Sequence, residues 1–211
     1  KMALAGRNKK ETWDQWYTGR FDLHPMKGLS VKGDYSWNRY STVQKFHRKE
    51  MTQTFPEGRD PYLVETPNYV RNYNSNNIYQ AINVWAEYKK SFNDVHNLSL
   101  MAGYNQEEKT YASTSYTMTD LYDNEMPISD LAINYKENEE GSDIWRVQGA
   151  FFRLNYDYRS KYLLEVNGRY DGSSKYAKHD RWAFFPSASV GWRISEEKFF
   201  KSLSKVVDNL K

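Results

Sequence analysis

Apolar and polar residues alternate with a period of two along much of the chain. Residues 162–171 (YLLEVNGRYD) are a clear example. One set of alternate positions holds Tyr162, Leu164, Val166, Gly168 and Tyr170; the other holds Leu163, Glu165, Asn167, Arg169 and Asp171. Because side chains of a β-strand point alternately to the two faces of the sheet, the segment predicts a strand with one apolar and one ionic face.

The same alternation predicts seven strands and an all-β fold. The expected strands lie near residues 12–24, 29–48, 77–91, 97–111, 146–158, 161–171 and 183–194. Short connections follow the first, third and fifth strands, and long ones follow the second, fourth and sixth. An antiparallel up-and-down meander gives this order when one end of the sheet carries tight turns and the other carries elaborated loops, as in outer-membrane barrels.

The last segment, residues 195–211, changes its period. Phe199, Leu203, Val206 and Leu210 fall near helical spacing, after Ser195 as an N-cap and two glutamates. This pattern predicts a short helix over 196–209 at the periplasmic rim, although a turn followed by another strand also fits.

The spacing of aromatic residues bears on what covers the apolar face. Tyr162 and Tyr170 lie eight residues apart on one face, and Phe184 and Trp192 repeat this spacing. Eight residues span about 26 Å of strand. With a strand tilt of about 40° this gives a height of about 20 Å, close to the apolar band between the two aromatic girdles of a membrane barrel. Rings with a polar edge suit the membrane interfaces.

We therefore expect a transmembrane antiparallel β-barrel segment, with about seven strands of a larger barrel, spanning residues 1–211. The alternative is a soluble or surface-attached carbohydrate-binding β-sandwich, which alternates in the same way. A sandwich has no physical reason to collect its long loops at one end.

Composition narrows the function classes. Lys and Arg number 30 and Asp and Glu 27, a net charge of +3, which is too balanced for a nucleic-acid partner. Aromatics at 17% argue against disorder. The absence of cysteine excludes disulfides, zinc–thiolate sites and thiol nucleophiles. No apolar run reaches the length of a membrane helix and no signal peptide opens the chain. We expect it to be part of a longer protein.

Residues 169–197 (RYDGSSKYAKHDRWAFFPSASVGWRISEE) carry a long motif. It has the form R-x-D-G-S-S-x-F/Y, then R-W/Y-x-x-F-P-S-x-S-x-x-W-R-I-S-x-E, running here from Arg169 to Glu197. In this it resembles the SusC/RagA-type TonB-linked outer-membrane proteins. Residues 149–169 resemble the preceding hairpin of that family.

The resemblance implies a nutrient importer of the bacterial outer membrane. Such a protein has a barrel of about 22 strands around a plug, a SusD-like lipoprotein lid, and oligosaccharide or peptide cargo. TonB pulls on an N-terminal box. These parts do not fit in 211 residues, so the resemblance implies an internal segment, about a third of the barrel, without plug or TonB box. We expect no catalysis and no cofactor. A passive porin would not differ in this segment.

Two sets of residues are candidates for the functional site. The first consists of polar residues expected to face the lumen: Arg153, Glu165, Asn167, Arg169 and Arg193. The second consists of tyrosines in the long loops 49–76 and 112–145, able to contact a ligand or the lid: Tyr62, Tyr69, Tyr73, Tyr116, Tyr122 and Tyr135. Packing of one loop on another is the alternative for each tyrosine.

The remaining motifs point to no chemistry. Residues 171–174 (DGSS) predict a turn more than a cation-binding loop. His24, His47, His96 and His179 lack partners at metal-ligand spacing and are expected at the surface. Adjacent carboxylates such as Glu196 and Glu197 would point to opposite faces of a strand and cannot form an acid–base pair.

Overall fold

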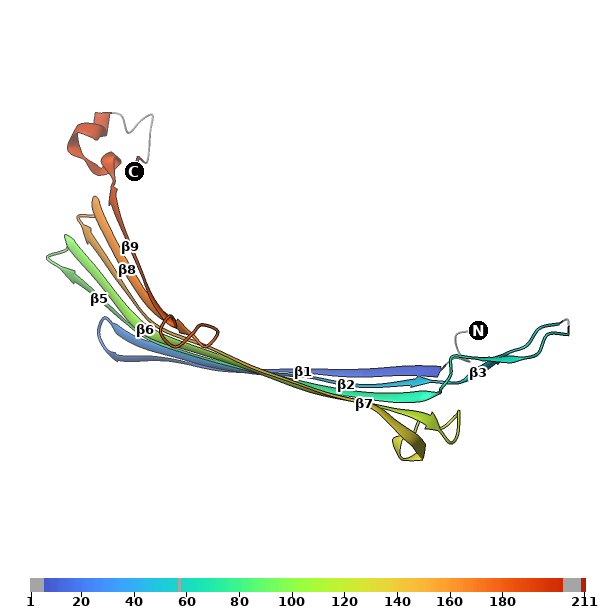
Figure 1. The fold of residues 1–211 in the computed structure, drawn as a ribbon. Coiled ribbons are helices and arrows are strands. Elements are labelled where there is room, and N and C mark those ends of the chain that lie inside the picture. Colours follow the sequence, from blue (N-terminus) through green and yellow to red (C-terminus); the bar gives the residue numbers. More distant parts are fainter. Residues whose placement is uncertain (1–5, 57, 203–209) are drawn as a thin grey trace. The chain divides into compact units, whose positions relative to one another are not determined.

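The computed structural model describes residues 6–56, 58–202 and 210–211. Its main element is one sheet of seven strands, in which every strand neighbours the next along the chain. Figure 1 shows these strands side by side in one layer. They are β1 (Gly6–Met26), β2 (Leu29–Arg48), β5 (Tyr69–Phe92), β6 (His96–Leu121), β7 (Ala132–Tyr158), β8 (Tyr162–Ser173) and β9 (Trp182–Trp192). The expected up-and-down topology is confirmed.

Several strands are longer than the alternation predicts. β5 begins at Tyr69 instead of residue 77, β6 continues to Leu121 instead of 111, and β7 begins at Ala132 instead of 146. Residues 134–143 are polar at both sets of alternate positions. Such a segment still pairs through its backbone, but its two faces have no contrast in hydrophobicity to reveal the strand.

The expected long loop at 49–76 contains a small hairpin. β3 (Met51–Gln53) pairs antiparallel with β4 (Tyr62–Val64), with Met51 opposite Val64 and Gln53 opposite Tyr62. The stretch left between long strands is therefore 49–68.

The C-terminal segment differs from the expected helix over 196–209. Two 3-10 turns, η3 (Ile194–Glu196) and η4 (Lys198–Ser202), follow β9, and residues 203–209 lie outside the described part of the chain. β9 ends at Trp192, and Arg193 is the extended residue that precedes η3.

The chain divides into two compact units. Unit 1 contains residues up to Trp16, Asn38–Tyr79 and Lys109–Ile144; unit 2 contains Tyr17–Trp37, Gln80–Glu108 and Trp145–Lys211. Each is described by itself below.

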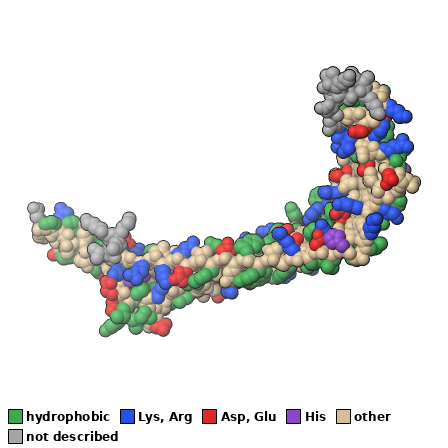
Figure 2. Space-filling view, turned by 180° about the vertical axis from the view of Figure 1, so that it is seen from behind, with side chains coloured by type: hydrophobic (Ala, Val, Ile, Leu, Met, Phe, Trp, Pro, Cys, Tyr) green, Lys and Arg blue, Asp and Glu red, His purple; other side chains and the backbone are tan. Residues whose placement is uncertain are grey.

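The register of β8 and β9 in unit 2 joins the apolar positions into a continuous face. Leu164 lies opposite Val190, and Val166 lies opposite Ala188. These residues are not covered by protein: 37% of Leu164 and 84% of Val190 are exposed. Figure 2 shows hydrophobic side chains at the surface beside charged ones. An exposed apolar face of this extent needs a non-aqueous neighbour, which favours a barrel in lipid over the soluble sandwich.

Among the described residues, no helix has the length and hydropathy needed to cross a membrane.

Candidate functional site

Aromatic side chains form two rows on the apolar face of unit 2. One row joins Tyr158, Tyr162 and Trp192, with ring centroids 6.3 and 6.4 Å apart. The other includes Tyr170 stacked on Trp182 at 5.0 Å. The rows lie at opposite ends of the β8–β9 ladder. This is the arrangement of girdles at two membrane interfaces.

The opposite face of β7 and β8 carries four of the five candidate lumen residues in hydrogen-bonded groups. Arg153 Nε donates to Asn167 Oδ1 at 2.8 Å, and Asn167 Nδ2 donates to Glu165 Oε1 at 2.8 Å. Arg169 Nε contacts both carboxylate oxygens of Asp171, at 2.8 and 2.7 Å. The structure thus brings these residues together. That they face a lumen stays a prediction.

Other strands of unit 2 extend this polar surface. Asn105 Nδ2 donates to Asn83 Oδ1 at 2.7 Å, and Asn83 Nδ2 donates to Asp34 Oδ1 at 2.8 Å. Asn97 Nδ2 donates to Asp157 Oδ1 at 3.0 Å. Amide groups hydrogen-bonded to acids and to one another across the strands form a hydrophilic wall.

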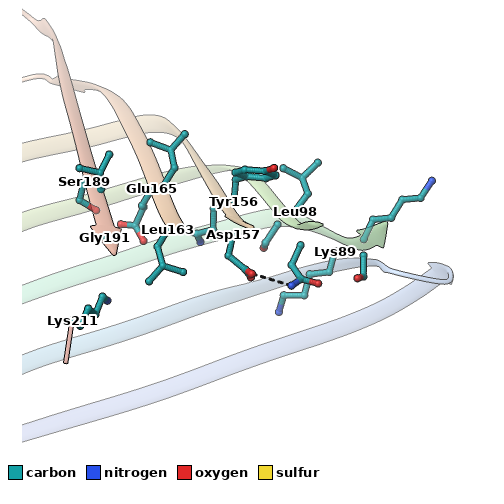
Figure 3. A pocket seen from close by; sticks show the side chains of 16 residues that line it. Lys89, Leu98, Tyr156, Asp157, Leu163, Glu165, Ser189, Gly191 and Lys211 are labelled. Atoms are coloured by element: carbon teal, nitrogen blue, oxygen red, sulfur yellow. Dashed lines mark hydrogen bonds between the residues drawn. The ribbon is translucent and has the colours of Figure 1, made fainter. Parts of the chain in front are cut away.

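A pocket of about 740 Å³ lies near the short turns of unit 2. Figure 3 shows Asp157 and Leu163 pointing to the side opposite Leu98 and Tyr156, and the Asp157–Asn97 hydrogen bond. Glu165 also lines the pocket.

The fifth candidate, Arg193, follows the end of β9, and its backbone N–H donates to the Lys161 carbonyl at 2.7 Å. The structure does not place it among the other four. Its backbone is still extended there, and its assignment to the lumen stays a prediction.

Glu197 is a residue whose contacts the alternation could not reveal. Its carboxylate accepts from Lys161 Nζ at 3.0 Å, Tyr162 Oη at 2.8 Å and Trp192 Nε1 at 3.4 Å. It therefore links the start of β8 with the end of β9. Only its place in the motif signalled that it matters.

We expect the stability of this rim to depend on pH through Glu197. Hydrogen bonds from Lys161, Tyr162 and Trp192 lower the pKa of the Glu197 carboxyl. The stabilisation is therefore present above the unfolded value, about pH 4, and is lost as the pH falls through the folded value. Thermal unfolding of the full-length receptor against pH measures this. Glu197→Gln should remove that part of the acid dependence, so that stability falls less steeply below about pH 4 than in the wild type; an unchanged acid limb would contradict the assignment.

The candidate tyrosines are mostly not in loops. Tyr69 and Tyr73 lie in β5, Tyr116 in β6 and Tyr135 in β7. Tyr62 lies in the small hairpin and donates to Gln53 Oε1 at 3.2 Å. Tyr122 follows β6 and is 86% exposed. The prediction that Tyr69, Tyr73, Tyr116 and Tyr135 lie in loops was wrong. These parts of the strands are polar on both faces, so their sequence resembles that of loops.

Two of these tyrosines share a pocket of about 350 Å³ in unit 1. Its lining residues come from β2, β5, β6 and β7: Gln44, Phe46, Tyr69, Arg71, Tyr73, Ser115 and Glu139. Phe46 stacks on Tyr69 at 5.5 Å, and the Arg48 guanidinium lies 4.7 Å from the centre of the Tyr69 ring. We call this set the aromatic pocket.

Polar groups surround the rings of the aromatic pocket. Arg71 Nε donates to Thr117 Oγ1 at 3.0 Å, and its Nη2 lies 3.3 Å from Glu137 Oε2. The Tyr73 and Tyr111 hydroxyls are 3.1 Å apart. Ring faces with nearby donors and acceptors suit a ligand that is apolar on one side and hydrogen-bonding at its edges, such as a sugar or a peptide unit.

Not every histidine lies at the surface as expected. His47 is only 4% exposed, and burial lowers its pKa, with Lys49 adding to the effect. Near it, Asn124 bridges two connections: Glu50 N donates to Asn124 Oδ1, and Asn124 Nδ2 donates to Glu50 O, both at 2.8 Å. In the described residues, no group of three or more His, Asp or Glu side chains is placed to hold a metal ion.

Comparison with known proteins gives both relatives and structural neighbours. A TonB-dependent receptor of Formosa agariphila is 33% identical over 118 residues, 55% of this chain and 11% of that protein. The TonB-dependent receptor SusC of Bacteroides thetaiotaomicron is 45% identical over 58 residues, 28% of this chain and 6% of SusC. The chain thus spans about a tenth or less of the length of these relatives.

The fold matches solved structures. The structure of the RagAB peptide transporter superposes with a TM-score of 0.81 at 18% identity, covering 95% of this chain and 22% of the transporter chain. The family model described as TonB dependent receptor-like, beta-barrel matches residues 3–204. The chain therefore belongs to the TonB-dependent receptor β-barrel family of the outer membrane and is similar to SusC over 58 residues.

Proposed function

We propose that this chain forms part of the wall of a TonB-dependent outer-membrane importer that takes up glycans or peptides under a SusD-like lipoprotein lid. The observation that carries the proposal is the two-sided sheet of unit 2. One face is apolar, exposed and bounded by rings; the other is a network of hydrogen-bonded polar residues. Such a wall separates lipid from a hydrated interior.

The polar face serves as the lining of the lumen in this proposal. Arg153, Glu165, Asn167 and Arg169 contact the plug and the water around it, and TonB acts through a region of the receptor outside this segment. Hydrogen bonds hold these polar side chains along the wall, which suits a hydrophilic lining.

The aromatic pocket serves as a contact for cargo. Tyr69 and Tyr73 of β5 both line this pocket, and Tyr69 stacks on Phe46 of β2. RagAB is described as a peptide transporter, whereas the names of the other relatives give no cargo, so both cargo classes stay open. Rings flanked by Arg71 and Gln44 bind either class through the same chemistry.

The test is uptake of radiolabelled oligosaccharides and peptides by cells that carry the full-length receptor, with and without TonB. We expect uptake of one of the two cargo classes to require both the receptor and TonB. Tyr69→Ala should weaken uptake at limiting cargo about two- to ten-fold, the range that one aromatic contact supplies. Tyr116→Ala is the matched control, because Tyr116 lies outside the aromatic pocket. TonB-independent uptake would instead identify a passive porin.

A further inference from the structure

The connection between β8 and β9 lies beside the second aromatic row. Trp182, the first residue of β9, stacks on Tyr170 and covers Gly172, where an added Cβ would overlap the indole ring. Trp182 and Tyr170 are 43% and 47% exposed. Because this row marks a membrane interface, the connecting residues 174–181 lie at the depth of lipid headgroups.

A pocket of about 320 Å³ opens at this place. Arg146 and Arg181 line it, together with Ser173, Ser174 and Trp182. Arg181 Nε donates to the Tyr176 carbonyl at 3.1 Å, which leaves both Nη groups for another acceptor. Arg181 has no ion pair among the described residues. Arg146 pairs with Glu108 through Nε at 2.6 Å, which leaves its Nη groups as further donors.

The connection between β8 and β9 that borders the pocket is basic. Residues 174–181 contain Lys175, Lys178 and Arg181 against one acid, Asp180, which lies 2.9 Å from His179. Two guanidinium groups with a serine hydroxyl are a donor set that matches the oxygens of a phosphate group.

The position of the pocket favours a lipid over a soluble ligand. Gln148, which also lines it, shares one face of β7 with Leu154 and Tyr156, and this is the apolar face of unit 2. Basic side chains at the edge of a membrane protein's apolar surface recognise anionic headgroups. The short turns of the barrel lie at the other end of these strands, so the pocket belongs to the extracellular leaflet.

We propose that Arg181 and Arg146, with Ser174, bind a phosphate of an outer-leaflet lipid from the outside of the barrel. The site holds a lipid against Trp182 and Tyr170. The proposal rests on the membrane face and not on the nature of the cargo, so a failed uptake experiment leaves it standing.

The test uses the full-length receptor purified in a neutral detergent, with diphosphorylated lipid A and its dephosphorylated form as probes, followed by native mass spectrometry. We expect the phosphorylated probe to bind more tightly. Arg181→Gln should weaken it about five-fold, the effect of one basic residue at a membrane surface. Arg159→Gln is the matched control, since Arg159 occupies the short turn at the other end of β8.

Three outcomes would overturn the proposal. Equal binding of the two probes would show that the pocket does not recognise the phosphate group. An equal loss in Arg181→Gln and Arg159→Gln would show non-specific charge attraction. Displacement of lipid A by millimolar inorganic phosphate would indicate a site for a free anion. Heat-modifiable migration of each variant in gels confirms that the variant is folded. If Arg181→Gln does not fold, Arg146→Gln gives a second variant of the same pocket.

Discussion

Arginine in place of Ala188 should sharply reduce the amount of folded receptor, whereas arginine at the adjacent Ser189 should be tolerated. Ala188 lies opposite Val166, midway between the Tyr162 and Tyr170 positions of β8. Arginine on the lipid face near the bilayer midplane costs about 2–4 kcal/mol. Ser189 lies opposite Glu165 on the polar face, where a cation finds an acid and water.

The measurement is denaturant unfolding of the full-length receptor reconstituted in vesicles, with the heat-modifiable fraction in outer membranes as a second readout. The two positions are neighbours, small and exposed, so they differ mainly in the face that they occupy. Equal effects of the two substitutions would contradict the membrane face and, with it, the importer.

Reversal of the charge at Arg169 should produce the second large effect. Arg169 binds both oxygens of Asp171 and lies 5.8 Å from the centre of the Phe151 ring. The Asp171 carboxylate occupies the space that a Cβ on Gly149 would need, directly beside residue 169. Arg169→Glu therefore places two carboxylates side by side. We expect a loss of about 1–3 kcal/mol, reduced by the partial exposure of the pair, and impaired uptake.

Arg59→Glu is the matched control, an equal reversal at an exposed residue between β3 and β4. Uptake per folded receptor separates a role in the lumen from a role in assembly alone. If both reversals lowered uptake to the same extent, the lumen assignment of Arg169 would be wrong. Asp171→Arg combined with Arg169→Glu should restore part of the folded fraction.

Much of the fold follows from the alternation because one face of each strand had to be apolar. In β8 that contrast identifies the strand, its faces and the positions of its rings. In β7 the contrast is absent around Lys136 and Glu139, and the strand went unrecognised there. Tyr135 was consequently assigned to a loop. The difference in hydrophobicity between the two faces of a strand depends on what covers each face. Alternation therefore cannot identify a strand that has water on both faces.

The sequence could likewise predict some groupings of the candidate site residues and not others. Arg153, Asn167 and Glu165 could be grouped from the sequence because they share one hairpin and a short turn fixes its register. The aromatic pocket could not, since Phe46, Tyr69 and Glu139 come from separate strands whose long connections leave the register open. The contacts of Glu197 were also hidden, because they depend on how the chain turns back after Trp192.

The lengths of the central strands have a further consequence. β5, β6 and β7 contain 24, 26 and 27 residues, although about 9–11 suffice to cross a bilayer. Most of each strand is therefore available for duties other than spanning. Side chains such as Tyr69 are held by the hydrogen-bonded backbone of a strand and not by a flexible loop. Cargo preference in such a scaffold can change through single substitutions, because a new side chain inherits a fixed position and direction.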